Sequence, residues 1–212
     1  MRKRNYQHLT DLWDEITQYG NWDGEYHDKM FHDIPNTECA DRAVFILQKC
    51  LDKTVLDIGC IGELHKKIEE VAKEVWGIDK EDSDLKNYWK VDIEKDGNFL
   101  KIVADKEFDI IICGEILEHL SNPGFFLEKL KNCNCPIVIT VPNAFSNGSG
   151  GWLTKGKECV NAEHVAWYSY YTLKNLVERY GYKVEEFYWA GEPHYFSEGI
   201  IMVIKQGGTK DG

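Results

Sequence analysis

The segment from Glu115 to His119 carries two carboxylates and an imidazole at the spacing of a helix. Glu115, Glu118 and His119 stand at positions i, i+3 and i+4, which predicts that their side chains share one face of a helix. The apolar run Phe108–Cys113 precedes them, so this face would lie at the carboxyl end of a strand. Imidazole has a suitable pKa for removing a hydroxyl proton at neutral pH. His119 or the later His164 is therefore a candidate general base.

A second group of candidates lies in the glycine-containing turn Asp57–Gly62, which follows another apolar run. Glycines at such a turn let the backbone approach a ligand closely. A dinucleotide site needs glycine at the positions that here hold Gly59, Ile61 and Leu64, so two of its three glycines are missing. The acidic Asp57 would disfavour a diphosphate and suits a cationic or zwitterionic ligand better. The turn therefore argues against a nicotinamide-dependent oxidoreductase.

Strand and helix patterns alternate through the middle of the chain and would position both groups. Short apolar runs predict strands at 54–58, 74–78, 88–93, 108–113, 136–141, 182–189 and 199–205. Asn122 followed by Pro123 predicts the start of one helix, and Ser169 predicts the start of another that Gly181 ends. The alternation predicts an α/β fold with a mostly parallel sheet, an antiparallel last strand and helices on both faces.

Other segments lie outside this alternation. Helices are predicted at Tyr6–Tyr19 and Ala40–Leu51, an aromatic, histidine-rich connector at Asn21–Ile34, and a long loop at Pro142–Ala162. We expect an N-terminal helical extension at 1–52 that could act as a lid, one domain at 53–206 and a frayed tail at 207–212. Four further histidines are expected at surface or packing positions: His27, His32, His65 and His194.

Composition restricts the classes of function. Acidic residues outnumber basic residues by 36 to 25, and the formal net charge of -11 argues against a protein that binds nucleic acid by covering phosphates with basic side chains. Seven cysteines without a CxxC pair favour free thiols in a reducing compartment, so we expect a cytoplasmic protein. The apolar runs are far shorter than a membrane span. The sequence leaves the oligomeric state open.

Between about Lys53 and Lys205, several short motifs follow one another in the order found in class I S-adenosylmethionine-dependent methyltransferases, and the sequence resembles that family. The turn at Gly59 resembles the loop that holds the methionine part of the cofactor, Asp79 the acidic residue that binds the ribose, and Asp92 the residue that meets the adenine amine. The resemblance implies a Rossmann-like, seven-stranded fold, S-adenosylmethionine as cofactor, and ten cofactor-binding residues: Asp57, Gly59, Cys60, Ile61, Gly62, Asp79, Asp92, Ile93, Cys113 and Glu115.

The family loop often has two further glycines, which Ile61 and Glu63 replace here. We expect Gly59 and Gly62 to suffice for the turn. A non-catalytic domain with weaker cofactor binding is the alternative that this departure leaves open.

The Glu-x-x-Glu-His segment resembles that of ubiquinone-type O-methyltransferases and of small-RNA 3′-end 2′-O-methyltransferases. In the second family these side chains and a later histidine hold a divalent metal, so the resemblance implies Glu115, Glu118, His119 and His164 as ligands. Three interpretations stay open. Glu118 and His119 orient the crevice without a metal, a histidine is the general base, or the four side chains bind Mg²⁺, Mn²⁺ or a similar ion.

These features predict an enzyme that transfers a methyl group from S-adenosylmethionine to a hydroxyl of a small molecule, such as a sugar or a natural product. Glu118, His119 and His164 are the expected catalytic residues. Two alternatives remain, a metal-dependent methyltransferase of RNA 2′-hydroxyls at a chain end and a non-catalytic cofactor-binding subunit.

Overall fold

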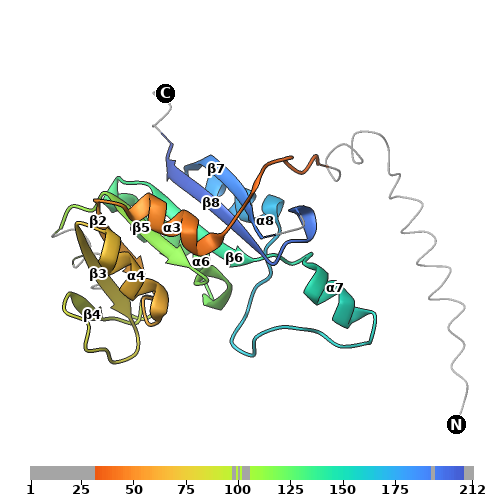
Figure 1. Ribbon diagram of the computed structural model, residues 1–212, viewed down its shortest axis with the longest axis horizontal. Coiled ribbons are helices and arrows are strands. Elements are labelled where there is room, and N and C mark those ends of the chain that lie inside the picture. The colour runs from red at the N-terminus through yellow and green to blue at the C-terminus, as the bar shows by residue number, and fades with distance from the viewer. Residues whose placement is uncertain (1–31, 97–98, 100, 102–105, 192–193, 208–212) are drawn as a thin grey trace, which may run out of the picture. The chain divides into compact units, whose positions relative to one another are not determined.

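The computed structural model of the chain describes residues 32–96, 99, 101, 106–191 and 194–207 (Figure 1). Contacts divide the chain into two units, Met1–Ile34 and Pro35–Gly212, and every helix and strand described below belongs to the second unit. The predicted helix at 6–19, the connector up to residue 31 with His27, and the tail from residue 208 lie outside the described residues. These expectations stay predictions.

The described residues form one sheet of eight strands in the order β1-β7-β8-β6-β5-β2-β3-β4. Neighbouring strands are parallel, except that β8 runs antiparallel to both β6 and β7. The bounds are β1 Cys39–Ala40, β2 Thr54–Ile58, β3 Glu74–Asp79, β4 Tyr88–Lys90, β5 Ile110–Gly114, β6 Ile137–Pro142, β7 Tyr182–Ala190 and β8 Gly199–Gln206. The predicted sheet is thus confirmed, and the two-residue β1 adds an eighth strand at its edge.

The strands of this sheet send alternate side chains to opposite faces. In β5, Ile110 and Ile112 pack in one core with residues of α3 (Arg42–Cys50) and α4 (Glu63–Val71). Ile111 packs in a second core with residues of α6 (Pro123–Leu130) and α8 (Tyr170–Arg179). Both faces are therefore covered, as predicted, and Figure 1 shows α3 and α4 together over one of them. A sheet buried on both faces leaves its polar side chains at the strand ends.

Side-chain caps set the starts of the helices. The Asn122 side chain accepts a hydrogen bond from the Phe125 N–H at 3.0 Å, and Pro123 is the first residue of α6, as predicted. Ser169 accepts from the Thr172 N–H at 3.2 Å, and the Thr172 hydroxyl oxygen accepts from the Ser169 N–H at 2.9 Å. This reciprocal cap begins α8.

The segment predicted as a long loop is partly helical, because α7 (Asn147–Leu153) lies within it. Ser146 caps this helix by accepting from the Ser149 N–H at 3.3 Å. The predicted domain boundary after residue 52 falls between α3 and β2, inside the compact unit that begins at Pro35. None of the described helices is both long and apolar enough to cross a membrane.

Substituting Ser169→Ala should lower the free energy of unfolding by about 1 kcal/mol, because the α8 cap loses its acceptor. Urea denaturation followed by circular dichroism measures this change. Ser121→Ala is the matched control, since Ser121 is exposed and its hydroxyl makes no hydrogen bond to any described residue. Equal stability of the two variants would contradict the role of the cap.

Candidate active site

A cavity of about 540 Å³ opens at the carboxyl ends of β2, β3, β4 and β5. Parallel strands bring the residues that follow them to this one edge of the sheet. Six of the ten predicted cofactor residues line the cavity, namely Gly59, Ile61, Asp79, Asp92, Ile93 and Glu115. The volume lies in the range of small-molecule and cofactor sites.

Gly59 forms the floor of this cavity through a turn that needs glycine for two reasons. Its φ angle is +77°, in the left-handed region, and a Cβ atom there would lie 2.1 Å from the Cδ1 atom of Ile116. The Gly59 N–H donates to the carbonyl of Ile78 at 2.8 Å, which ties the turn to the end of β3. The two turns after β2 and β5 can approach each other only because residue 59 has no side chain.

Two carboxylates on the cavity wall are held by neighbouring groups. Asp79 accepts from the N–H groups of Ile61 at 3.4 Å and Glu81 at 3.1 Å, through different oxygens. Asp92 pairs with Lys95 at 2.9 Å, and the hydrogen bond from Lys95 lowers the pKa of Asp92. The wall therefore presents an anionic acceptor at the end of β4.

The other four predicted cofactor residues lie outside the cavity. Cys60 and Gly62 line a neighbouring groove, and Cys113 is fully buried, where burial raises the pKa of its thiol. Asp57 is buried beneath the turn, and its Oδ2 lies 2.7 Å from the Nδ1 of His65. Burial raises the pKa of Asp57, and the hydrogen bond with His65 opposes that shift.

Glu115 does not share a helical face with Glu118 and His119, so that prediction was wrong. The only helical segment here is a single 3₁₀ turn, η1 (Leu117–His119), and Glu115 precedes it with a φ angle of +55°. The Glu115 Oε1 lies 2.8 Å from the Nη1 of Arg42 and accepts from the Thr140 hydroxyl at 3.0 Å. The Glu115 carboxylate thus reaches Arg42 of α3, and it is not among the described side chains whose ligand atoms cluster around Glu118.

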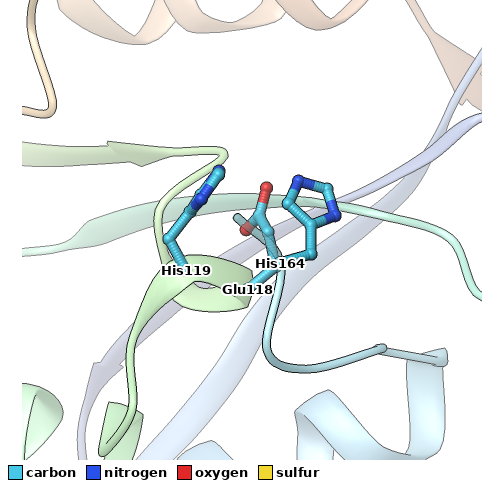
Figure 2. Close-up of side chains that lie close together, drawn as sticks. All are labelled: Glu118, His119 and His164. Atoms are coloured by element: carbon cyan, nitrogen blue, oxygen red, sulfur yellow. The ribbon is translucent and has the colours of Figure 1, made fainter. Parts of the chain in front are cut away.

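Glu118, His119 and His164 do come together at the rim of the cavity. Each offers a ligand atom, and these atoms lie within 4.8 Å of one another. Figure 2 shows the Glu118 carboxylate beside the two imidazole rings, which meet edge to face with their centroids 4.6 Å apart. The N–H groups of Val165 and Ala166 donate to the Glu118 carbonyl at 2.8 and 3.2 Å, which holds the loop with His164 against η1. Among the three, His119 lines the cavity.

The protonation of this cluster is set by burial. Both carboxylate oxygens of Glu118 are buried and have no hydrogen-bond partner among the described residues. Burial, with a smaller effect from the charge of Glu115, raises the pKa of Glu118 to about 8. Burial also lowers the pKa of His164, and the nearby His119 adds to that shift. At neutral pH these shifts favour a protonated Glu118 carboxyl and a neutral His164 imidazole, and the neutral imidazole can accept a proton.

Sequence reasoning missed three residues of this site. Arg42 compensates the charge of Glu115, and no local pattern links α3 with the end of β5. Glu163 lines the cavity, and its Oε2 lies 4.0 Å from the Nδ1 of His119. His65, expected at a surface or packing position, is buried and bonded to Asp57. In the sequence, the one indication of this role was that His65 falls in the first turn of the helix after β2.

Comparisons with solved structures show the fold. The structure is similar to that of small RNA methyltransferase HEN1, with a TM-score of 0.62 and 15% identity over 83% of this chain and 27% of that chain. It is also similar to a SAM-dependent methyltransferase from Archaeoglobus fulgidus, with a TM-score of 0.56 and 19% identity over 77% of this chain and 94% of that chain. This chain thus spans only about a quarter of the HEN1 chain, but nearly all of the chain from Archaeoglobus fulgidus.

A third similar structure is the 1,6-didemethyltoxoflavin-N1-methyltransferase of Burkholderia thailandensis, with bound 1,6-didemethyltoxoflavin and S-adenosylhomocysteine. The TM-score is 0.57 at 15% identity, over 98% of this chain and 92% of that chain. No curated protein matches the sequence. Residues 30–186, well over half of the chain, match the family described as a methyltransferase domain. The chain therefore belongs to this methyltransferase family, and its fold is that of the S-adenosylmethionine-dependent enzymes.

Proposed function

We propose that this protein transfers the methyl group of S-adenosylmethionine to a hydroxyl of a small molecule. One observation carries the proposal. A cluster of Glu118, His119 and His164, in which Glu118 is buried and the two histidines are half-buried, lies at the rim of a cavity that has the place and size of a cofactor site. His119 belongs to the cluster and also lines the cavity. Transfer to a hydroxyl at neutral pH requires removal of a proton, whereas transfer to a neutral amine does not need a base before attack.

The cavity wall suits this cofactor. Asp79, at the end of β3, is the proposed acceptor for the ribose hydroxyls, and Asp92, after β4, the proposed acceptor for the adenine amine. The close approach of backbone at Gly59 leaves room for the methionine part. The carboxylates on the wall attract a cationic sulfonium, and the same wall would repel the diphosphate of a dinucleotide.

The reaction that follows is an in-line displacement. The acceptor oxygen attacks the methyl carbon, the carbon–sulfur bond breaks, and its electron pair stays on sulfur to give neutral S-adenosylhomocysteine. The hydroxyl proton passes to the cluster, where His119 is placed to take it. The carboxyl of Glu118 has a pKa of about 8, so it accepts a proton only in its ionised form, which becomes more populated as the pH rises toward that value. Alignment of oxygen, carbon and sulfur supplies most of the acceleration.

A divalent cation fits the same cluster. The orphaned carboxylate of Glu118 and the imidazoles of His119 and His164 form a mixed oxygen and nitrogen donor set, which suits Mn²⁺ or Fe²⁺ better than Mg²⁺. Glu115 is not part of this set, because it pairs with Arg42. When bound, such an ion would lower the pKa of the acceptor hydroxyl.

A second candidate is methylation of an RNA 2′-hydroxyl at a chain end. The structural similarity to HEN1 and the presence of the Glu118, His119 and His164 cluster favour it. The net charge of -11 opposes it, since a polyanion would have to approach an acidic protein. Salt-dependent binding of a labelled RNA duplex would favour this candidate over a small molecule. The free cysteines keep a cytoplasmic location as our prediction for either activity.

Calorimetry with S-adenosylhomocysteine tests the cofactor site. We expect micromolar binding, and Asp79→Asn should weaken it about 10–100-fold, because a charged hydrogen bond to the ribose is lost. Asp52→Asn is the control, since Asp52 is an exposed aspartate before β2 that lines neither the cavity nor the neighbouring groove. An absence of binding at millimolar ligand would overturn the proposal. Binding without release of S-adenosylhomocysteine across a broad acceptor panel would instead favour a non-catalytic subunit.

Above pH 8, where Glu118 is ionised and can act as a base, Glu118→Gln should lower kcat about 100-fold or more while leaving the KM for the cofactor unchanged, because proton removal is impaired and the cofactor cavity is intact. Steady-state assays at saturating acceptor measure both constants. Glu128→Gln, an exposed change on α6, should leave both unchanged. Full activity of Glu118→Gln would show that the cluster takes no part in the reaction.

Treatment with EDTA distinguishes a cluster that binds a catalytic cation from one that acts without a metal. If Glu118, His119 and His164 hold a cation, chelation abolishes activity and added Mn²⁺ restores it. Activity that EDTA leaves unchanged would reject a catalytic ion and leave the base alone. Metal analysis of the purified protein gives the corresponding stoichiometry.

The raised pKa of Glu118 also predicts how stability depends on pH. The folded protein holds this proton up to a pKa of about 8, whereas the unfolded chain releases it near 4.5, so the folded state binds more protons between these values. Wild type should therefore lose stability relative to Glu118→Gln as pH rises through this window, by more than about 1 kcal/mol near pH 8. Urea titrations in EDTA at several pH values measure this, and parallel pH curves would contradict it.

A further inference from the structure

A buried pair of polar side chains lies directly beneath the cofactor turn and outside the cavity. The Nδ1 of His65 lies 2.7 Å from the Oδ2 of Asp57, and the two residues are only 2% and 5% exposed. Asp57 belongs to β2, and His65 belongs to the first turn of α4. The whole turn from Gly59 to Gly62 lies between these two residues in the chain. The hydrogen bond therefore joins the two ends of the turn.

The space around this pair is filled closely. Gly77, the register partner of Asp57 on β3, has no side chain. A Cβ atom at Gly77 would lie 2.5 Å from the Sγ of Cys60 and 3.2 Å from the Cε1 of His65. The imidazole and the Cys60 thiol thus occupy the volume above Gly77. Close packing on β3 leaves the His65 ring little freedom to move away from Asp57.

The turn above the pair depends on few contacts of its own. The Gly59 N–H donates to the Ile78 carbonyl at 2.8 Å, and two longer hydrogen bonds of 3.4 Å run from the Cys60 N–H to the same carbonyl and from the Ile61 N–H to Asp79. Ile61 is about half exposed, so its side chain anchors the turn weakly. A short, buried hydrogen bond below the turn is therefore the strongest polar link between its two ends.

We propose that His65 is a positioning residue for methyl transfer. Its hydrogen bond to Asp57 holds the turn from Gly59 to Gly62 in the conformation that faces the cofactor cavity. The inference rests on the proposed function, because the turn is taken to contact S-adenosylmethionine. Loss of the Nδ1 donor would leave the Asp57 carboxylate buried without its partner, and the turn would open to hydrate it.

Three substitutions of His65 separate the hydrogen bond from the volume of the ring. His65→Asn places an amide nitrogen where Nδ1 stands, His65→Gln moves that nitrogen one carbon farther, and His65→Leu removes it. We expect the Kd for S-adenosylhomocysteine to rise about tenfold or more in the Leu and Gln variants and less than about threefold in the Asn variant. The KM for the acceptor should stay near the wild-type value in all three.

Hydrogen exchange of the free protein gives a readout that does not depend on the cofactor. Amides of residues 59–62 should exchange faster in the Leu and Gln variants and at the wild-type rate in the Asn variant. Amides in α8, on the opposite face of the sheet, should be unchanged and so report intact global folding. If the Leu variant does not fold, the comparison of the Asn and Gln variants still tests whether the hydrogen bond to Asp57 holds the turn.

Two results would overturn the proposal. The first is a folded Leu or Gln variant whose cofactor Kd and turn exchange both match wild type. The second is an Asn variant as impaired as Leu, because ring volume and not the Nδ1 donor would then matter. Wild-type protein that does not bind S-adenosylhomocysteine would refute the proposed function instead, and exchange at residues 59–62 would still confirm or refute the role of His65.

Discussion

At the turn after β2, the Cδ1 of Ile116 lies 2.1 Å from where a Cβ of Gly59 would be. The left-handed backbone at Gly59 and its missing side chain let the turns after β2 and β5 pack against each other. Ile116 also lines the cavity, and it directly precedes the η1 turn that carries Glu118 and His119. One contact thus connects the wall of the cavity with the cluster of Glu118, His119 and His164.

Around the cavity, a hydrogen bond and burial shift the pKa values of two acidic side chains in opposite directions. The pKa of Asp92 is lowered by the hydrogen bond from Lys95, so it remains an anionic acceptor. The pKa of Glu118 rises to about 8, because its carboxylate is buried without a hydrogen-bond partner among the described residues. Glu115 forms an ion pair with Arg42, which compensates its charge. The acidic composition of the chain therefore contributes both to attraction of a cationic cofactor and to storage of a proton.

The strands, the helix starts and most of the cavity could be predicted, because each depends on local pattern. Asn122 and Ser169 cap their helices through neighbours three residues away, and Gly59 and Asp79 follow predicted parallel strands to one edge. Glu115 could not be placed correctly. Helical spacing assumes continuous helical backbone, and the left-handed φ angle at Glu115 interrupts it before the helical turn begins.

The sequence by itself determined the methyltransferase family, seven of the eight strands of the described sheet, and six of the residues that line the cavity. Local hydrogen bonding and apolar periodicity suffice for these features. Only the tertiary structure decided which of those side chains meet. It pairs Glu115 with Arg42, buries Asp57 with His65, and brings Glu118 close to His119 and His164. These outcomes depend on burial and on contacts between distant segments, which no local spacing specifies.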